Sequence, residues 1–318
     1  MKNRPLASLL ITLSSLLLAG CASLAERERA WIFQPNQTSR NIGTQAAREM
    51  DEVWIEFESR VTGKTGRLHG LWLAARQDLS PDPQAGAKAP ADAIKVQLPG
   101  QAEKAGPALA GSAGDQGPVL LYLHGARWDV TASSFRMRRM QELGFSVLGV
   151  DYRGFGKTSA ELPSEEMAYE DARAAWNWLA ERYPQRPRYI FGHSLGGPIA
   201  IHLAAEVSDE SGTIVEGTFT SMAELVSSFR WGWAPVTALI TQRFEAARKV
   251  DKIGSPLLVV HGLQDRLIAP ALGRKLYDAA VEPKLLVLVE GGSHHNTNAM
   301  GQPQYKTALA QLFKLEPR

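Results

Sequence analysis

A serine lies in a glycine-rich turn at residues 192–197, which read GHSLGG. A short apolar segment at 189–191, typical of a buried strand, precedes the turn, and an apolar helical segment follows it. The pattern G-x-S-x-G between a strand and a helix predicts a tight turn, where side chains at Gly192 and Gly196 would collide with neighbouring backbone. Such a turn exposes Ser194 as a nucleophile, provided that a base removes its proton.

A candidate base and a candidate acid follow later strands. Asp265 comes after the apolar segment 257–260, and two adjacent histidines come after the apolar segment 285–289. The chain order Ser, Asp, His is expected when successive strand ends supply one catalytic triad. Because His294 directly follows Gly-Gly-Ser, we predict that it is the base and that His295 packs or caps. No metal site is expected from this pair, since adjacent side chains point apart and no carboxylate cluster accompanies them.

A third strand end supplies a candidate oxyanion hole, a pair of N–H donors for a developing negative charge. The apolar segment 119–123 is followed by His124, a glycine, Ala126 and Arg127. We predict that the Ala126 amide is one donor, with the Arg127 amide as the second choice for that role. The other donor is the amide of Leu195, next to the nucleophile. We expect His124 to brace the loop rather than take part in the chemistry.

The elements that must position these residues alternate between apolar strands and amphipathic helices. Such alternation predicts an α/β fold with a mostly parallel, doubly wound sheet, whose chemistry lies at the carboxyl ends of the strands. Alternating apolar and polar residues at 53–59, followed by a mostly apolar segment at 68–74, predict an antiparallel opening hairpin. One helix is expected to begin after Ser164, a plausible N-cap. The predicted core strands lie at 119–123, 145–150, 189–191, 213–215, 257–260 and 285–289.

Together these motifs resemble the alpha/beta-hydrolase superfamily. The segments 151–159 (DYRGFGKTS) and 162–166 (LPSEE) strengthen the resemblance. The chain is similar to the branch of small membrane-associated serine hydrolases that includes depalmitoylase-like members and many bacterial esterases. The resemblance implies an alpha/beta-hydrolase fold with a short lid, with Ser194 as nucleophile, His294 as base and Asp265 as acid.

The resemblance covers about residues 53–315, apart from a segment at 78–117, and it departs from the family at one position. That branch often has Asn where this chain has Ala126, so a backbone donor remains but a side-chain contact is lost. Dehalogenases and epoxide hydrolases of the superfamily typically use aspartate as nucleophile, which Ser194 disfavours. The resemblance therefore implies hydrolysis of carboxylic esters or thioesters without a cofactor.

The first residues resemble a bacterial lipoprotein signal. Two basic residues precede a leucine-rich stretch at 5–18, too short to span a bilayer comfortably and typical of a signal-peptide core. The sequence LAGC at 18–21 resembles a lipobox, which implies cleavage after residue 20 and acylation of Cys21. In lipoproteins of enteric bacteria, an aspartate directly after the acylated cysteine signals retention in the inner membrane. This chain has Ala22 at that position, so the resemblance implies the outer membrane. An ordinary secretory signal with an incidental cysteine is the alternative.

The remaining composition sets the domain organisation. The chain has 318 residues and a formal net charge of +2, with the two surplus charges inside the predicted signal, so no nucleic-acid partner is expected. A single cysteine excludes an intrachain disulfide. We predict an anchor and tether at 21–52 and one domain at 53–318. Within that domain, the Ala/Gly/Pro-rich segment 78–117 is expected to be a flexible insertion.

Aromatic and apolar residues between Phe229 and Leu239 occupy the usual place of a lid. Apolar residues over the site would favour an acyl chain, so we expect acyl esters reached at or near the membrane. Ordinary helix packing is an equally good interpretation of these aromatics. The rival functional hypothesis is a non-catalytic envelope lipoprotein that uses the fold as an interaction module.

Overall fold

The computed structural model describes residues 24–35, 43–75, 117–229, 237 and 239–315. The predicted signal peptide, Cys21, nearly all of the predicted insertion and most of the predicted lid therefore lie outside the described residues.

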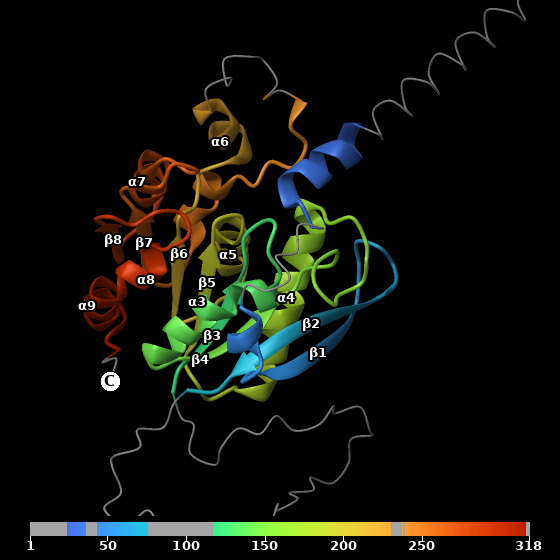
Figure 1. The fold of residues 1–318 in the computed structure, drawn as a ribbon, viewed down its shortest axis with the longest axis horizontal. Helices are drawn as coiled ribbons and strands as arrows, with labels where there is room; N and C mark the ends of the chain where they lie inside the picture. The colour runs from blue at the N-terminus through green and yellow to red at the C-terminus, as the bar shows by residue number, and fades with distance from the viewer. Residues whose placement is uncertain (1–23, 36–42, 76–116, 230–236, 238, 316–318) are drawn as a thin grey trace, which may run out of the picture.

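Strands of the described chain form one eight-stranded sheet in the order β1-β2-β4-β3-β5-β6-β7-β8 (Figure 1). β2 pairs antiparallel with both β1 and β4, and all other pairs are parallel. The predicted doubly wound, mostly parallel sheet with an antiparallel opening hairpin is confirmed. The strands are β1 Asp51–Glu58, β2 Thr65–Leu73, β3 Val119–Leu123, β4 Ser146–Val150, β5 Arg188–His193, β6 Gly212–Glu216, β7 Leu257–Gly262 and β8 Lys284–Val289.

Helices cover both faces of the sheet (Figure 1). Alternate residues of one strand supply the two cores: Val119 and Leu121 pack on the face covered by α4, α5 and α7, whereas Leu120 and Tyr122 pack on the face covered by α3 and α9. The continuous apolar strands follow from this double coverage. The helical segments are α2 Thr44–Ala47, α3 Val130–Glu142, α4 Glu165–Arg182, α5 Gly196–Ala204, α6 Met222–Ser228, η2 Ala246–Arg248, η3 Val250–Lys252, α7 Pro270–Ala279, α8 Thr297–Met300 and α9 Gln302–Phe313.

The predicted start of α4 is confirmed at its N-cap. The Ser164 hydroxyl accepts a hydrogen bond from the Met167 amide at 3.2 Å, which satisfies one of the free N–H groups at the helix start.

Part of the predicted tether belongs to the folded domain. Residues 24–33 form a helix, and Ile32 and Phe33 at its end are buried in the core. The Phe33 ring contacts Phe155 and Phe244 at centroid distances of 6.4 and 5.9 Å. Residues 24–33 of the predicted anchor and tether at 21–52 therefore pack against the domain predicted at 53–318.

Candidate active site

Ser194 occupies the turn between β5 and α5 with a φ of 56°, a left-handed conformation that is unfavourable for a residue with a side chain. The turn leaves no space at its glycines: a Cβ on Gly192 would lie 2.2 Å from the Gly196 oxygen, and one on Gly196 would lie 2.1 Å from the Leu123 oxygen. The Ser194 amide donates to the Glu216 carbonyl at 3.0 Å. The neighbouring strand β6 thus holds the strained turn, in which Ser194 is only partly buried.

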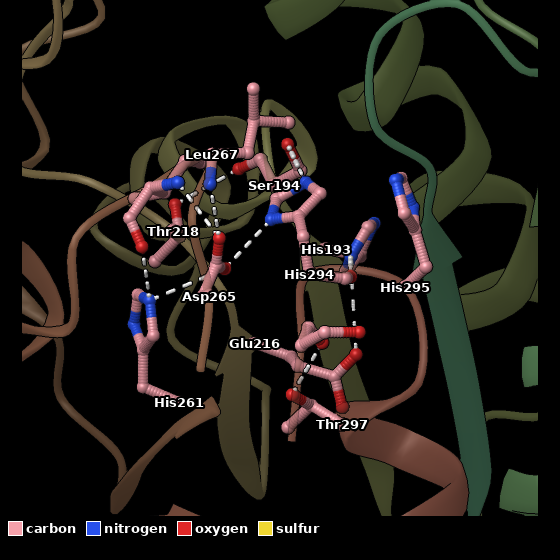
Figure 2. Close-up of polar contacts among 12 residues, drawn as sticks. His193, Ser194, Glu216, Thr218, His261, Asp265, Leu267, His294, His295 and Thr297 are labelled. Atoms are coloured by element: carbon pink, nitrogen blue, oxygen red, sulfur yellow. Dashed lines mark hydrogen bonds and ion pairs between the residues drawn. The ribbon is translucent and has the colours of Figure 1, made fainter. Parts of the chain in front are cut away.

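The structure brings Ser194, His294 and Asp265 into one chain of hydrogen bonds (Figure 2). His294 Nε2 lies 3.1 Å from Ser194 Oγ, and His294 Nδ1 lies 2.8 Å from Asp265 Oδ2. Because an ionised carboxylate only accepts, Nδ1 carries the proton and Nε2 is free to accept the serine proton. This is the geometry of a nucleophile, a base and an orienting acid.

Asp265 is held rigidly by its own loop. Its Oδ1 accepts hydrogen bonds from the Leu267 and Ile268 amides at 2.9 and 2.8 Å, and the His261 imidazole lies 3.5 Å from Oδ2. Burial alone would raise the pKa of Asp265, but hydrogen bonds from His261, His294 and Ile268 outweigh it and hold the pKa below its usual range. The carboxylate therefore stays charged and oriented toward the base.

His295 lies outside this chain of hydrogen bonds. It is exposed, points away from Asp265, and stacks on Trp128 with ring centroids 5.3 Å apart (Figure 2). Burial, followed by the charges of His294 and Arg136, lowers its pKa. Of the two adjacent histidines, only His294 contacts the serine. His295 packs on Trp128, one of the two roles predicted for it.

The loop after β3 lies directly against the serine. A Cβ on Gly125 would lie 3.0 Å from Ser194 Cβ, so a side chain at residue 125 would crowd the nucleophile. The Arg127 amide, the second-choice donor, is occupied because it donates to the Phe33 carbonyl at 3.0 Å. Within the described chain, no hydrogen bond uses the amides of Ala126 and Leu195. These two amides thus remain the candidate oxyanion donors.

His124 braces this loop from below. It is fully buried, its Nδ1 lies 2.7 Å from the Gly125 oxygen, and the Tyr152 hydroxyl donates to its carbonyl at 3.1 Å. Burial lowers the pKa of His124, so the ring is neutral at pH 7. No contact of His124 with Ser194 is found, as expected for a structural role.

Sequence reasoning missed four buried residues around the triad: His261, His193, Arg136 and Glu216. His261 could have been found, since it lies at the end of a strand four residues before a candidate acid. His193 directly precedes the nucleophile, but it occupies a variable position of the G-x-S-x-G pattern, so nothing in the sequence indicates its role. Arg136 and Glu216 lie inside a helix and a strand, and only the tertiary structure places them behind the base.

The part of the chain that the structure describes contains no group of three or more His, Cys, Asp or Glu side chains arranged to hold a metal ion. None of its helices has the length and apolar character needed to cross a membrane. A cavity of about 700 Å³ between the start of α4 and residues 241–249 is lined by no triad residue.

Comparison with known proteins finds one matching family and several relatives. A family described as serine aminopeptidase, S33 matches residues 115–251. An uncharacterized protein of Mycobacterium tuberculosis is 33% identical over 187 residues, which are 58% of this chain and 66% of that protein. The lysophosphatidylserine lipase ABHD12 of Danio rerio is 31% identical over 189 residues, 53% of this chain and 49% of the lipase.

A further relative has wider coverage. Alpha/beta hydrolase domain-containing protein 17B of Xenopus laevis is 32% identical over 204 residues, 62% of this chain and 67% of its own length. The chain therefore spans between about half and two thirds of the curated relatives described here.

The fold also matches solved structures. An esterase of Pyrococcus furiosus aligns with a TM-score of 0.57 over 83% of this chain and 92% of the esterase. At 15% identity, this likeness shows the fold alone.

Proposed function

The chain belongs to the alpha/beta-hydrolase superfamily, and on that premise we propose that it is a serine carboxylesterase or thioesterase that cleaves acyl esters. The observation that carries the proposal is the hydrogen-bonded chain from Ser194 through His294 to Asp265, at 3.1 and 2.8 Å. The rival hypothesis, a non-catalytic interaction module, gives no physical reason for a serine, a histidine and an aspartate to be hydrogen-bonded in this order.

In the first half-reaction, Ser194 Oγ attacks the acyl carbonyl carbon while His294 Nε2 takes the hydroxyl proton. The carbonyl oxygen gains negative charge, for which the Ala126 and Leu195 amides are the candidate donors. When the bond to the alcohol or thiol breaks, the protonated His294 gives its proton to the leaving group. The product of this step is an ester between the acyl group and Ser194.

In the second half-reaction, water takes the place of the alcohol. His294 removes a proton from water, and the resulting hydroxide attacks the acyl-enzyme carbonyl. Collapse of the tetrahedral intermediate returns the proton to Ser194 Oγ and releases a carboxylic acid. Asp265 keeps Nδ1 of the base protonated and stabilises the imidazolium in both steps.

The preference for an acyl ester draws on two observations. The name of the zebrafish relative is that of a lipase acting on lysophosphatidylserine. In this chain, Phe229 and Leu239 are 38% and 64% exposed at the two ends of the predicted lid. Exposed apolar side chains in a lid favour an acyl chain as part of the substrate. The family description, serine aminopeptidase, makes peptide hydrolysis the competing activity to test.

The test combines active-site labelling with a substrate series. The wild-type protein is treated with a fluorophosphonate probe and assayed on p-nitrophenyl esters of increasing chain length, a thioester and an aminoacyl p-nitroanilide. We expect labelling of Ser194, loss of labelling in Ser194→Ala, and turnover of the esters or the thioester. Turnover of the anilide alone would replace the proposal by peptidase activity, and absence of both labelling and turnover would support the non-catalytic module.

We also propose that Cys21 is acylated and anchors the protein in the bacterial envelope, in the outer membrane facing the periplasm. Acylation contributes about 0.8 kcal/mol per buried methylene, and stable anchoring needs more than one chain. We predict that the protein expressed with its leader incorporates a palmitate analogue and sediments with outer-membrane vesicles. The Cys21→Ser variant is expected to lose the label, and a label that persists in it would contradict the assignment.

The contact between Phe33 and the oxyanion loop leads to a prediction about turnover. The Phe33 carbonyl holds the amide of Arg127, whose φ is 76°, next to the candidate donor Ala126. We expect Phe33→Ala to lower the free energy of unfolding by about 3 kcal/mol and, under conditions where the variant is folded, to lower kcat about 10-fold. Urea unfolding and ester kinetics measure the two effects.

Phe145→Ala is the matched control for this prediction. Phe145 is equally buried but packs on the opposite face of the sheet, against Tyr189. It is expected to lose similar stability while kcat stays within about twofold. Equal kcat losses in the two variants would show that Phe33 acts through stability alone.

A further inference from the structure

A buried ion pair lies behind the base. Arg136 of α3 and Glu216 at the end of β6 are both fully buried. Arg136 Nε lies 3.3 Å from Glu216 Oε1, and the Tyr305 hydroxyl donates to Glu216 Oε2 at 2.6 Å. Burying a guanidinium is unfavourable unless its N–H donors are paired. The groups that Arg136 contacts besides Glu216 are therefore the ones that this ion pair holds in place.

One guanidinium nitrogen of Arg136 reaches both sides of the triad. Its Nη2 lies 3.1 Å from the His294 oxygen, 3.3 Å from the His295 oxygen and 3.0 Å from His193 Nε2. The first two contacts fix the backbone that carries the base. The third fixes the residue directly before the nucleophile.

The protonation of His193 is consistent with this arrangement. His193 Nε2 lies 3.0 Å from Arg136 Nη2 and 3.1 Å from the His294 carbonyl oxygen. It accepts from the guanidinium in one tautomer and donates to the carbonyl in the other, so in both tautomers it links the nucleophile turn to the base loop. Burial, followed by the charge of Arg136, lowers the pKa of His193 well below its usual value, and the ring is neutral at pH 7. The rings of His193 and His294 lie with their centroids 5.0 Å apart.

We infer that Arg136 is a positioning residue, which holds the base loop and the nucleophile turn at the separation that proton transfer requires. This inference rests on the proposed function for its kinetic test. Arg136 touches no reacting atom. It acts through the main chain of His294 and through His193, so its loss lets the distance between Nε2 and Ser194 Oγ vary. A displacement of about 1 Å at such a site can cost about 10²-fold in rate.

The experiment avoids leaving a buried charge unpaired. Because removing one partner of a buried ion pair is strongly destabilising, Arg136→Met is made together with Glu216→Gln and compared with the wild type. Arg136→Lys alone is the rescue variant, since it keeps an ion pair with Glu216 and its ammonium group can still donate to carbonyl oxygens. Arg138→Met is the matched control, because Arg138 lies on the same helix but binds Ala46 and Glu49, away from the site.

We expect Arg136→Met combined with Glu216→Gln to lower kcat about 10²-fold relative to the wild type, with KM within about twofold and partial recovery in Arg136→Lys. Arg138→Met is expected to leave kcat unchanged. Amide hydrogen exchange across residues 293–297 should accelerate in the methionine variant. The far-downfield proton resonance of the hydrogen bond between His294 and Asp265 should broaden there.

A folded methionine variant with kcat within about threefold of its reference, or with unchanged exchange and resonance, would overturn the inference. Wild-type protein that turns over none of the substrates would count against the proposed function instead. In that event, hydrogen exchange and the proton resonance still decide the role of Arg136, because neither needs turnover.

Discussion

Replacing His294 with glutamine is expected to lower kcat for acyl esters by about 10⁶-fold, whereas His295→Gln leaves kcat within about threefold. His294 Nε2 lies 3.1 Å from Ser194 Oγ and is the group that accepts its proton. Without a base the hydroxyl is a weak nucleophile, and loss of the base costs about as much as loss of the whole triad. His295 stacks on Trp128 and makes no contact with the serine. Steady-state kinetics on the best ester of the series measures both variants.

The two adjacent histidines control for each other. Both variants change imidazole to a neutral amide in the same loop, so a general disturbance of that loop would lower the two rates together. Near-ultraviolet circular dichroism checks that each variant is folded. Full activity in His294→Gln, or an equal loss in His295→Gln, would disprove the assignment of the base.

Asp265→Asn is expected to lower kcat about 10⁴-fold with little change in KM. The asparagine can keep the hydrogen bonds from the Leu267 and Ile268 amides through its oxygen. Its NH₂ group then faces His294 Nδ1 and favours the tautomer with the proton on Nε2. That tautomer cannot accept the serine proton. Asp278→Asn, an exposed position on α7, is the control with unchanged kinetics, and comparable activity in the two variants would contradict the role of Asp265.

The difference in stability between the wild type and Asp265→Asn is expected to depend on pH in a defined direction. The pKa of Asp265 is lower in the folded protein than the value of about 3.9 of an unfolded chain. A carboxyl group whose pKa is lowered by folding stabilises the protein when the pH is above its unfolded-state pKa. This contribution is lost as the pH falls toward the folded-state pKa. Thermal unfolding should therefore show a Tm difference between wild type and Asp265→Asn that is constant from pH 7 to 5 and shrinks below about pH 4. A difference that grows on acidification would contradict this direction.

Much of the fold could be predicted because its signals are local. Apolar strands alternating with amphipathic helices predicted the parallel sheet, and the hairpin of β1 and β2 followed from alternating polarity. The cap at Ser164 was visible for the same reason, since capping depends on residues within one helical turn. Element bounds shifted by a few residues, as for β5, which spans Arg188–His193 where the sequence predicted a strand at 189–191.

The candidate site was predicted where its residues follow strand ends. Parallel strands bring their carboxyl ends to one edge, so Ser194, Asp265 and His294 could be expected near one another before any distance was known. The choice between Ala126 and Arg127 as oxyanion donor was different. It depends on the Phe33 carbonyl, which comes from a helix far away in the chain and occupies the Arg127 amide.

The strand-turn-helix unit around Ser194, the order in which acid and base follow it, and the choice of His294 as base could all be predicted, because glycine spacing and apolar periodicity act over a few residues. The packing of residues 24–33 onto the oxyanion loop and the burial of Arg136 and Glu216 behind the base became visible only in the folded protein. These outcomes depend on contacts between segments distant in sequence. Such contacts form only when the sheet and its covering helices close around one core, and no local pattern records them.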